Sequence, residues 1–115
     1  MLKLGKPIPV KILFEEAGEE HEVLLSLRPP DRAFLAGLRK ASEEGDEGAD
    51  AWLTAERVAE QVMEWQGISD EHGEPLEVSA WGLQQVRDLA PMVWAGIVDA
   101  LFKTLAKKKE EARGN

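Results

Sequence analysis

The 115-residue sequence predicts an α+β fold, with an N-terminal β-hairpin followed by a mainly α-helical bundle of about four helices. Two observations predict it. Apolar residues alternate over two short N-terminal runs, and from residue 31 onward they recur at helical spacing behind residues that cap helices. We expect one domain over residues 1–106, with the hairpin over 8–28 and the helical part over 31–106. A charged, frayed tail is expected over 107–115.

The hairpin is predicted by two runs with a period of two residues. Their alternating apolar positions are Ile8, Val10, Ile12, Phe14, Val23, Leu25 and Leu27. The segment between the runs, EEAGEE, is polar and contains Gly18, as in a tight turn. An isolated hairpin is barely stable in water, so its apolar face must pack on another element.

The first helix is predicted after Pro29 and Pro30, which cannot continue a strand ladder. Asp31 offers an N-cap. Apolar residues then follow at helical spacing, at Phe34, Leu35, Leu38 and Ala41. The next stretch, SEEGDEGAD at residues 42–50, has five acidic residues, two glycines and no large apolar side chain. We expect a mobile acidic loop there.

Three further helices complete the expected bundle. The second helix begins at Asp50 or Thr54 and ends at Gln66, where Gly67 is expected to form a left-handed C-cap. Its apolar stripe consists of Ala55, Val58, Ala59, Val62 and Met63. Ser79 is expected to cap a short helix over 80–89. Pro91 suits the first turn of a last helix that runs to about Lys107.

The last helix is more apolar than a surface helix requires. Its apolar residues are Met92, Val93, Trp94, Ile97, Val98, Leu101, Phe102 and Leu105. A surface helix needs an apolar stripe of roughly 100°, and this one exceeds it. The helix either lies in the centre of the domain or turns one side to a partner, and both can hold together.

Composition disfavours several classes of function. The net charge is −8, and residues 1–102 carry −11 because the last thirteen residues are basic. An acidic body disfavours nucleic-acid binding, which needs clustered Lys and Arg. The most apolar stretch, residues 89–102, is interrupted by Pro91 and Asp99 and is too short to span a bilayer. We therefore expect a cytoplasmic protein with no nucleic-acid or membrane partner.

The segment WQGISDEHGEPL, residues 65–76, contains the only cluster that suggests chemistry. Counted from Asp70, a calcium loop would need ligands at His72 and Glu74 and a terminal Glu where Trp81 stands, so that pattern fails. A zinc site would need a second His or Cys at a defined spacing. We expect a tight turn with Gly73 at positive φ and an exposed His72. No metal, cofactor or catalytic residue is expected, so the protein is not expected to be an enzyme.

Four tryptophans and no tyrosine form a biased aromatic set. Tryptophan combines a large apolar area with one N–H donor and is enriched at binding hot spots. We expect Trp65 and Trp94 to fill the core between helices. Trp52, beside the acidic segment, and Trp81, in the first turn of its helix, are expected to be exposed anchors.

Two motifs carry a resemblance to a known family. The first, W-x-G-I-x-D-x-x-G-x-P-L, falls on Trp65, Gly67, Ile68, Asp70, Gly73, Pro75 and Leu76. The second, R-x-x-D-R-A-x-L, falls on Arg28, Asp31, Arg32, Ala33 and Leu35. With these motifs, residues 8 to 106 resemble the tail assembly chaperones of long-tailed bacteriophages and prophages. The motifs are packing and turn signatures and contain no catalytic residues.

The resemblance implies a non-enzymatic chaperone that binds the tape measure protein and helps the major tail tube protein assemble around it. Such a protein acts in the bacterial host cytoplasm and is not expected in the mature virion. The apolar contacts expected to bind the partner, or to join copies in a homo-oligomer, are Trp94, Ile97, Leu101 and Phe102. Trp52 and Trp81 are the further expected contacts.

A second hypothesis belongs to another class of function. A small acidic regulatory or inhibitor protein could occupy a basic site on a host or phage protein through residues 43–50. Such binding is lost at high salt, whereas binding in an apolar groove survives it.

Overall fold

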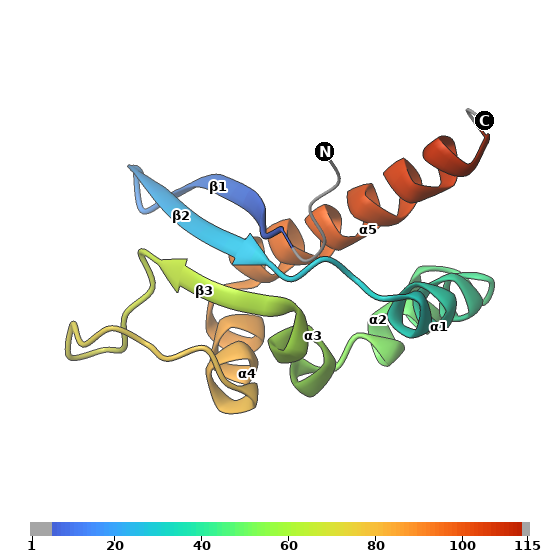
Figure 1. Cartoon of the computed structure of the whole chain (residues 1–115). Helices are drawn as coiled ribbons and strands as arrows, with labels where there is room; N and C mark the ends of the chain where they lie inside the picture. The colour runs from blue at the N-terminus through green and yellow to red at the C-terminus, as the bar shows by residue number, and fades with distance from the viewer. Residues whose placement is uncertain (1–5, 114–115) are drawn as a thin grey trace.

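Three antiparallel strands and five helices make up the part of the chain that the structure describes (Figure 1). This computed structural model describes residues 6–113, with side chains to residue 104. The elements are β1 (Ile8–Glu16), β2 (Glu19–Leu27), α1 (Arg32–Ser42), α2 (Asp46–Trp52), α3 (Ala55–Gln61), β3 (Val62–Gln66), α4 (Ala80–Leu89) and α5 (Pro91–Arg113). The predicted mixture of a sheet and helices is confirmed. The strand β3 and the helix α2 were not predicted.

The N-terminal hairpin forms as predicted, with its alternating apolar side chains on one face. β1 pairs antiparallel with β2 from Ile8 opposite Leu27 to Glu16 opposite Glu19. The two turn residues, Ala17 and Gly18, both have positive φ, at 54° and 79°. Positive φ at both positions gives the type I′ turn, whose twist matches that of the flanking strands. The side chains predicted to point inward are buried or half-buried.

The second helix was predicted to end at Gln66, and this prediction is wrong. The helix ends at Gln61, and Val62–Gln66 forms β3, which pairs antiparallel with β2. The apolar residues of this segment have helical spacing, but residues 62–66 form a strand. The reason is that β2 has an open edge, and its backbone N–H and C=O groups pair with those of β3. A bulge in the β2–β3 ladder leaves Met63 exposed, although we expected it in a helical stripe.

Gly67 has the predicted positive φ but not the predicted role. Its φ is +95°, and it follows a strand, so it is not a helix C-cap. A Cβ at this position would lie 2.6 Å from the backbone oxygen of Glu22. The chain therefore leaves the sheet in tight contact with β2, and only glycine fits without a shift.

The acidic segment expected to be a mobile loop is largely helical. α2 begins after Gly45, and Asp46 and Glu47 occupy its first turn, where negative charge favours the helix dipole. Ala49 is buried, and Trp52 meets the ring of Phe34 from α1 edge-on, with the ring centroids 5.1 Å apart. Packing against α1 thus orders a segment that has no large apolar residue before Trp52.

The predicted helix starts are confirmed by their capping bonds. Asp31 Oδ1 accepts the backbone N–H of Phe34 at 2.8 Å and so caps α1. Thr54 caps α3, and Ser79 Oγ accepts the N–H of Gly82 at 3.0 Å to cap α4. α5 begins at Pro91, as predicted. These caps satisfy N–H groups that would otherwise have no partner.

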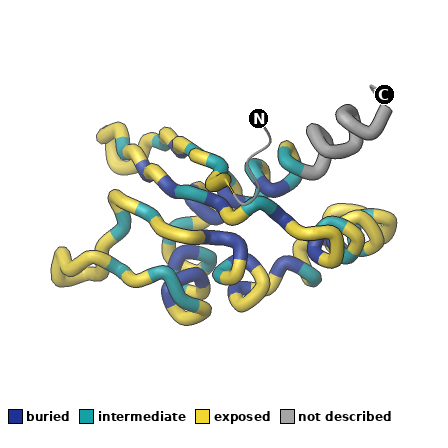
Figure 2. Tube along the Cα trace, viewed as in Figure 1, coloured by how far each residue is buried: buried dark blue, intermediate teal, exposed yellow. Residues whose placement is uncertain are grey.

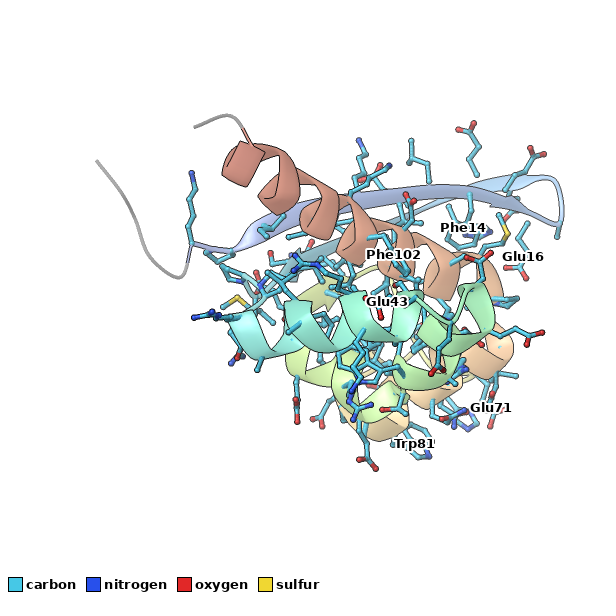
Figure 3. The ribbon with its side chains drawn as sticks, turned by 90° about the vertical axis from the view of Figure 1, so that its right-hand side faces the viewer. Phe14, Glu16, Glu43, Glu71, Trp81 and Phe102 are labelled. Atoms are coloured by element: carbon cyan, nitrogen blue, oxygen red, sulfur yellow. The ribbon has the colours of Figure 1, made fainter. Side chains whose placement is uncertain are left out.

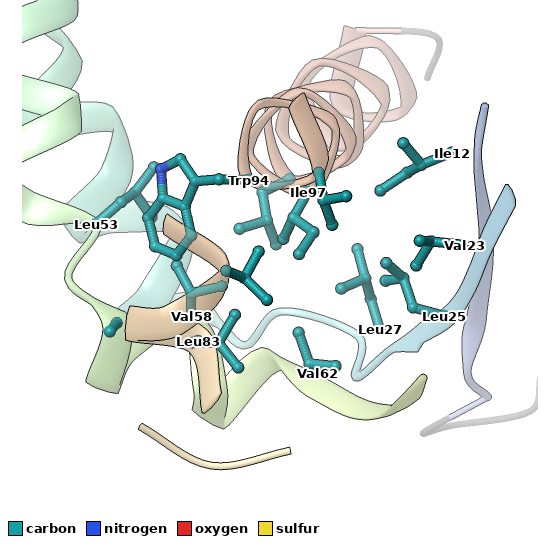
Figure 4. Close-up of a cluster of buried hydrophobic side chains, with 14 of the residues drawn as sticks. Ile12, Val23, Leu25, Leu27, Leu53, Val58, Val62, Leu83, Trp94 and Ile97 are labelled. Carbon is teal, nitrogen blue, oxygen red and sulfur yellow. The ribbon is translucent and has the colours of Figure 1, made fainter. Parts of the chain in front are cut away.

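The part of α5 from Val93 to Leu101 lies in the centre of the fold, which confirms the first of the two interpretations of its wide apolar face. It contacts β1 and α4, and its Ile97 and Leu101 are fully buried. Figure 4 shows Trp94 near Leu53 at one end of the cluster, with Ile12 at the other. The buried positions of Figure 2 accordingly gather between the sheet, α5 and the α3–α4 pair.

The C-terminal end is only partly described. α5 continues past Lys107 to Arg113, and the side chains of 105–115 lie outside the described residues, as does the expected fraying of 107–115. Within the part of the chain that the structure covers, no helix has both the length and the apolar character needed to cross a bilayer.

Two glycines at positive φ allow a matched test of the contact at the end of β3. Gly73→Ala places a Cβ in open space at φ +81°, so we expect a loss of about 1 kcal/mol in unfolding free energy. Gly67→Ala adds a backbone clash with Glu22, and we expect a loss of about 2–3 kcal/mol. Urea denaturation measures both values, and equal losses would contradict the described contact.

Candidate functional site

The turn that follows β3 is held by its own hydrogen bonds. Asp70 Oδ1 accepts the backbone N–H groups of His72 at 2.8 Å and Glu74 at 3.0 Å. The N–H of Asp70 in turn donates to the carbonyl oxygen of Glu74, and Gly73 has φ +81°. The carboxylate of Asp70 therefore stabilises the turn. The predicted tight turn with positive φ at Gly73 is confirmed, although it joins a strand to a helix rather than two helices.

Trp65 fixes this turn to the rest of the domain. Its indole Nε1 donates to the carbonyl oxygen of Leu76 at 2.6 Å, across the base of the turn. Ser69 and Pro75 form a single bridge inside it. Trp65 itself pairs with Leu25 in the sheet and is half-buried, so its indole connects the sheet to the segment that leads into α4.

The charged side chains of the turn lie on the surface. His72 lies on the surface as predicted, and its Nε2 is 3.4 Å from a carboxylate oxygen of Glu71. Both side chains are more than three-quarters exposed, so water screens the pair. No group of three His, Cys, Asp or Glu side chains with metal-binding geometry occurs among the residues described.

A groove lies between this turn and α4. It has a volume of about 320 Å³ and is lined by Ile68, Ser69, Asp70, Glu71, Leu76, Trp81, Gln85, Val86 and Leu89. Two of its apolar side chains are unusually exposed, Trp81 at 64% and Leu89 at 74%. An exposed tryptophan beside an exposed leucine in one concave surface is typical of a protein-binding site.

One wall of the groove is acidic and the other is helical. Asp70 and Glu71 line it from the turn, while Trp81, Gln85 and Leu89 follow one another at four-residue spacing along α4. Residues four apart share one face of a helix. In Figure 3 Trp81 and Glu71 lie in the lower part of the molecule, below Phe14 and Glu16 of the hairpin.

Three of the expected partner contacts are core residues. Ile97 and Leu101 are fully buried, and Trp94 is 7% exposed, with the guanidinium of Arg87 at 5.0 Å from its ring centroid. These side chains cover the inner face of the sheet and the α3–α4 pair, so a partner cannot reach them in this conformation. The same burial confirms the expectation that Trp94 fills the core.

The other three expected contacts differ in exposure. Trp81 is exposed, as predicted. Trp52, expected to be exposed, is half-buried between the ring of Phe34 and the guanidinium of Arg57, which lies 4.5 Å from the Trp52 ring centroid. Phe102 is half-buried and packs against the core. The groove therefore contains one of the six residues named from the sequence.

Leu89, Ile68 and Leu76 also line the groove and were not predicted to do so. Leu89 could have been found from its spacing, because it lies eight residues after Trp81 on the same predicted helix face. Ile68 and Leu76 could not, since their proximity to α4 depends on how the turn folds back on itself.

Comparisons with known proteins give no match. No protein-family model, no curated protein and no solved structure matches this chain.

The hydrogen bond of Trp65 can be tested against an exposed tryptophan. Trp65→Phe removes the donor to Leu76, and we expect a loss of about 1–2 kcal/mol in unfolding free energy. Trp81→Phe changes a side chain that is 64% exposed, so a change within about 0.5 kcal/mol is expected. Chemical denaturation followed by far-UV circular dichroism measures both, and an equal cost would show that the indole bond contributes nothing specific.

Proposed function

We propose that this protein is a non-enzymatic tail assembly chaperone that binds an apolar helical segment of the tape measure protein and so assists tail-tube assembly. The observation that carries the proposal is the joint exposure of Trp81 and Leu89 in one groove. The resemblance of residues 8–106 to such chaperones supplies the identity of the partner.

The groove suits a helix as its occupant. A helix on one wall and a turn on the other leave a concave apolar strip, the arrangement in which an amphipathic helix docks by residues at i, i+3 and i+4. The tape measure protein is long and helical, and before the tail tube encloses it, it would expose apolar stripes along its helices and aggregate. Covering one stripe with Trp81 and Leu89 would keep it soluble until the tube protein replaces the chaperone.

Charge supports a partner with basic residues beside its apolar stripe. Asp70 and Glu71 lie in the groove, and residues 1–102 carry a net charge of −11. Complementary charge raises association rates and selects partners more than it adds affinity. We therefore expect Lys or Arg beside the apolar residues of the bound segment.

An acidic regulatory protein is the second candidate. Glu43, Glu44, Asp46 and Glu47 are all exposed around the start of α2 and present a dense negative surface. Binding through this surface depends on screened charges, so it weakens steeply with salt. Binding in the groove depends on apolar burial and persists, which separates the two candidates in one titration.

The proposal predicts that groove variants lose the partner while keeping the fold. The chain is co-expressed with the tape measure protein, and capture and solubility of the latter are measured. Trp81→Ala and Leu89→Ala are each expected to weaken binding by roughly 10- to 100-fold, as for hot-spot residues. Met63→Ala, which changes an exposed apolar residue on the sheet, is the matched control and is expected to bind normally.

Two outcomes would contradict the proposal. One is a tape measure protein that neither co-purifies with the chain nor becomes more soluble. The other is full binding by a folded Trp81→Ala, Leu89→Ala double variant, which would remove the groove from the interaction.

A further inference from the structure

We propose that the free edge of β1 pairs antiparallel with β1 of a second copy, centred on Leu13, to form a two-fold symmetric dimer with one continuous six-stranded sheet. This surface lies on the hairpin, away from the groove on α4, and the inference does not depend on the proposed function.

The edge of β1 is open for pairing. Among the described residues the strand order is β1-β2-β3, so β1 pairs with a strand on one side only. The two-residue turn makes Glu16 and Glu19 the hydrogen-bonded pair that closes the hairpin. Because bonded and non-bonded pairs alternate, the even residues of β1 bond to β2, and Pro9, Lys11, Leu13 and Glu15 direct their backbone groups outward.

The other edge of the sheet is less suited to pairing. β3 has five residues, a bulge interrupts its ladder with β2, and Gly67 ends it in a backbone contact. β1 has nine residues in unbroken register. A long regular edge is the one that a second chain can extend.

The side chains along the open edge are self-complementary about Leu13. Lys11, Leu13 and Glu15 share the outer face of β1, and Leu13 is 67% exposed. Antiparallel pairing about Leu13 places the two Leu13 side chains opposite each other. It also places each Lys11 opposite Glu15 of the other copy, which gives two pairs of opposite charge. Cross-strand pairs of this kind are the units that stabilise a sheet.

Neighbouring registers are worse for identifiable reasons. Centring on Lys11 sets two lysines opposite each other and brings Pro9, which has no N–H, into the ladder. Centring on Ile12 also brings in Pro9 and leaves Lys11 opposite Leu13. Centring on Leu13 sets Pro9 opposite the turn residue Ala17, beyond the paired region, so its missing N–H is not needed.

The dimer would relieve a charge conflict within each hairpin. Glu15 lies directly opposite Glu20 in the β1–β2 register, a like-charge pair. Lys11 is 3.6 Å from Glu22, and its side chain is 58% exposed, so it is free to reach a second carboxylate. Lys11 of the second copy would bring a positive charge to the Glu15–Glu20 pair.

The inner face offers space for the second copy. A depression of about 530 Å³ runs between β1 and α5 and is lined by Ile8, Pro9, Val10, Lys11, Ile12, Leu13, Gly96, Asp99, Ala100, Lys103 and Thr104. In the Leu13-centred register, Phe14 of the second copy lies beside Ile12 at this depression.

Charge reversal tests both the dimer and its register. Analytical ultracentrifugation of the full chain over a dilution series is expected to show a monomer–dimer equilibrium. Lys11→Glu or Glu15→Lys alone makes both cross-strand pairs like-charged, and the dimer dissociation constant is expected to rise on the order of tenfold or more. The Lys11→Glu, Glu15→Lys double variant restores opposite pairs and dimerises again, and an equimolar mixture of the two single variants forms a heterodimer.

The control is Lys40→Glu, which makes the same change in net charge as Lys11→Glu at an exposed site on α1 and is expected to dimerise normally. Far-UV circular dichroism checks that each variant is folded. A wild-type chain that stays monomeric at the highest concentration overturns the inference. So does a mixture of single variants that fails to associate while the wild type dimerises, because only this register pairs Lys11 with Glu15.

Discussion

The fold depends on one helix, α5, which covers the apolar face of the sheet and the apolar side of the α3–α4 pair. The apolar face of the three-stranded sheet must be buried against another element, and the α3–α4 pair needs its own apolar side covered as well. The middle of α5 meets both requirements, with Ile97 and Leu101 fully buried and Trp94 nearly so. The wide apolar face of this helix is therefore a consequence of its central position.

This use of α5 determines where a partner can bind. Residues committed to the core are not free for recognition, so the exposed apolar side chains that remain become the informative ones. Among the large apolar side chains described, the three most exposed lie in two places on separate elements. Trp81 and Leu89 lie in the groove beside the turn, and Leu13 lies on the open edge of the sheet. The first suits an apolar helix and the second suits another strand, so the two surfaces can be occupied together.

The sequence predicted the features that are local in the chain. The hairpin follows from alternation and a glycine turn, and the caps Asp31 and Ser79 each act on the N–H three residues later. β3 was not predictable in the same way, because Val62–Gln66 is a strand only through its pairing with β2, about forty residues earlier. Trp81 was recognised from its position on the helix. The turn side of the groove required the folded path of residues 68–76.

Amide hydrogen exchange of the free chain, and of its complex with the tape measure protein, tests the central claim that α5 is core and the α4 groove is the binding surface. At exchange times too short for global unfolding, we expect residues 93–101 to be protected in both states. Protection on binding is expected over residues 68–76 and 81–89. Rapid exchange of 93–101 in the free chain, followed by protection of that helix in the complex, would contradict the account.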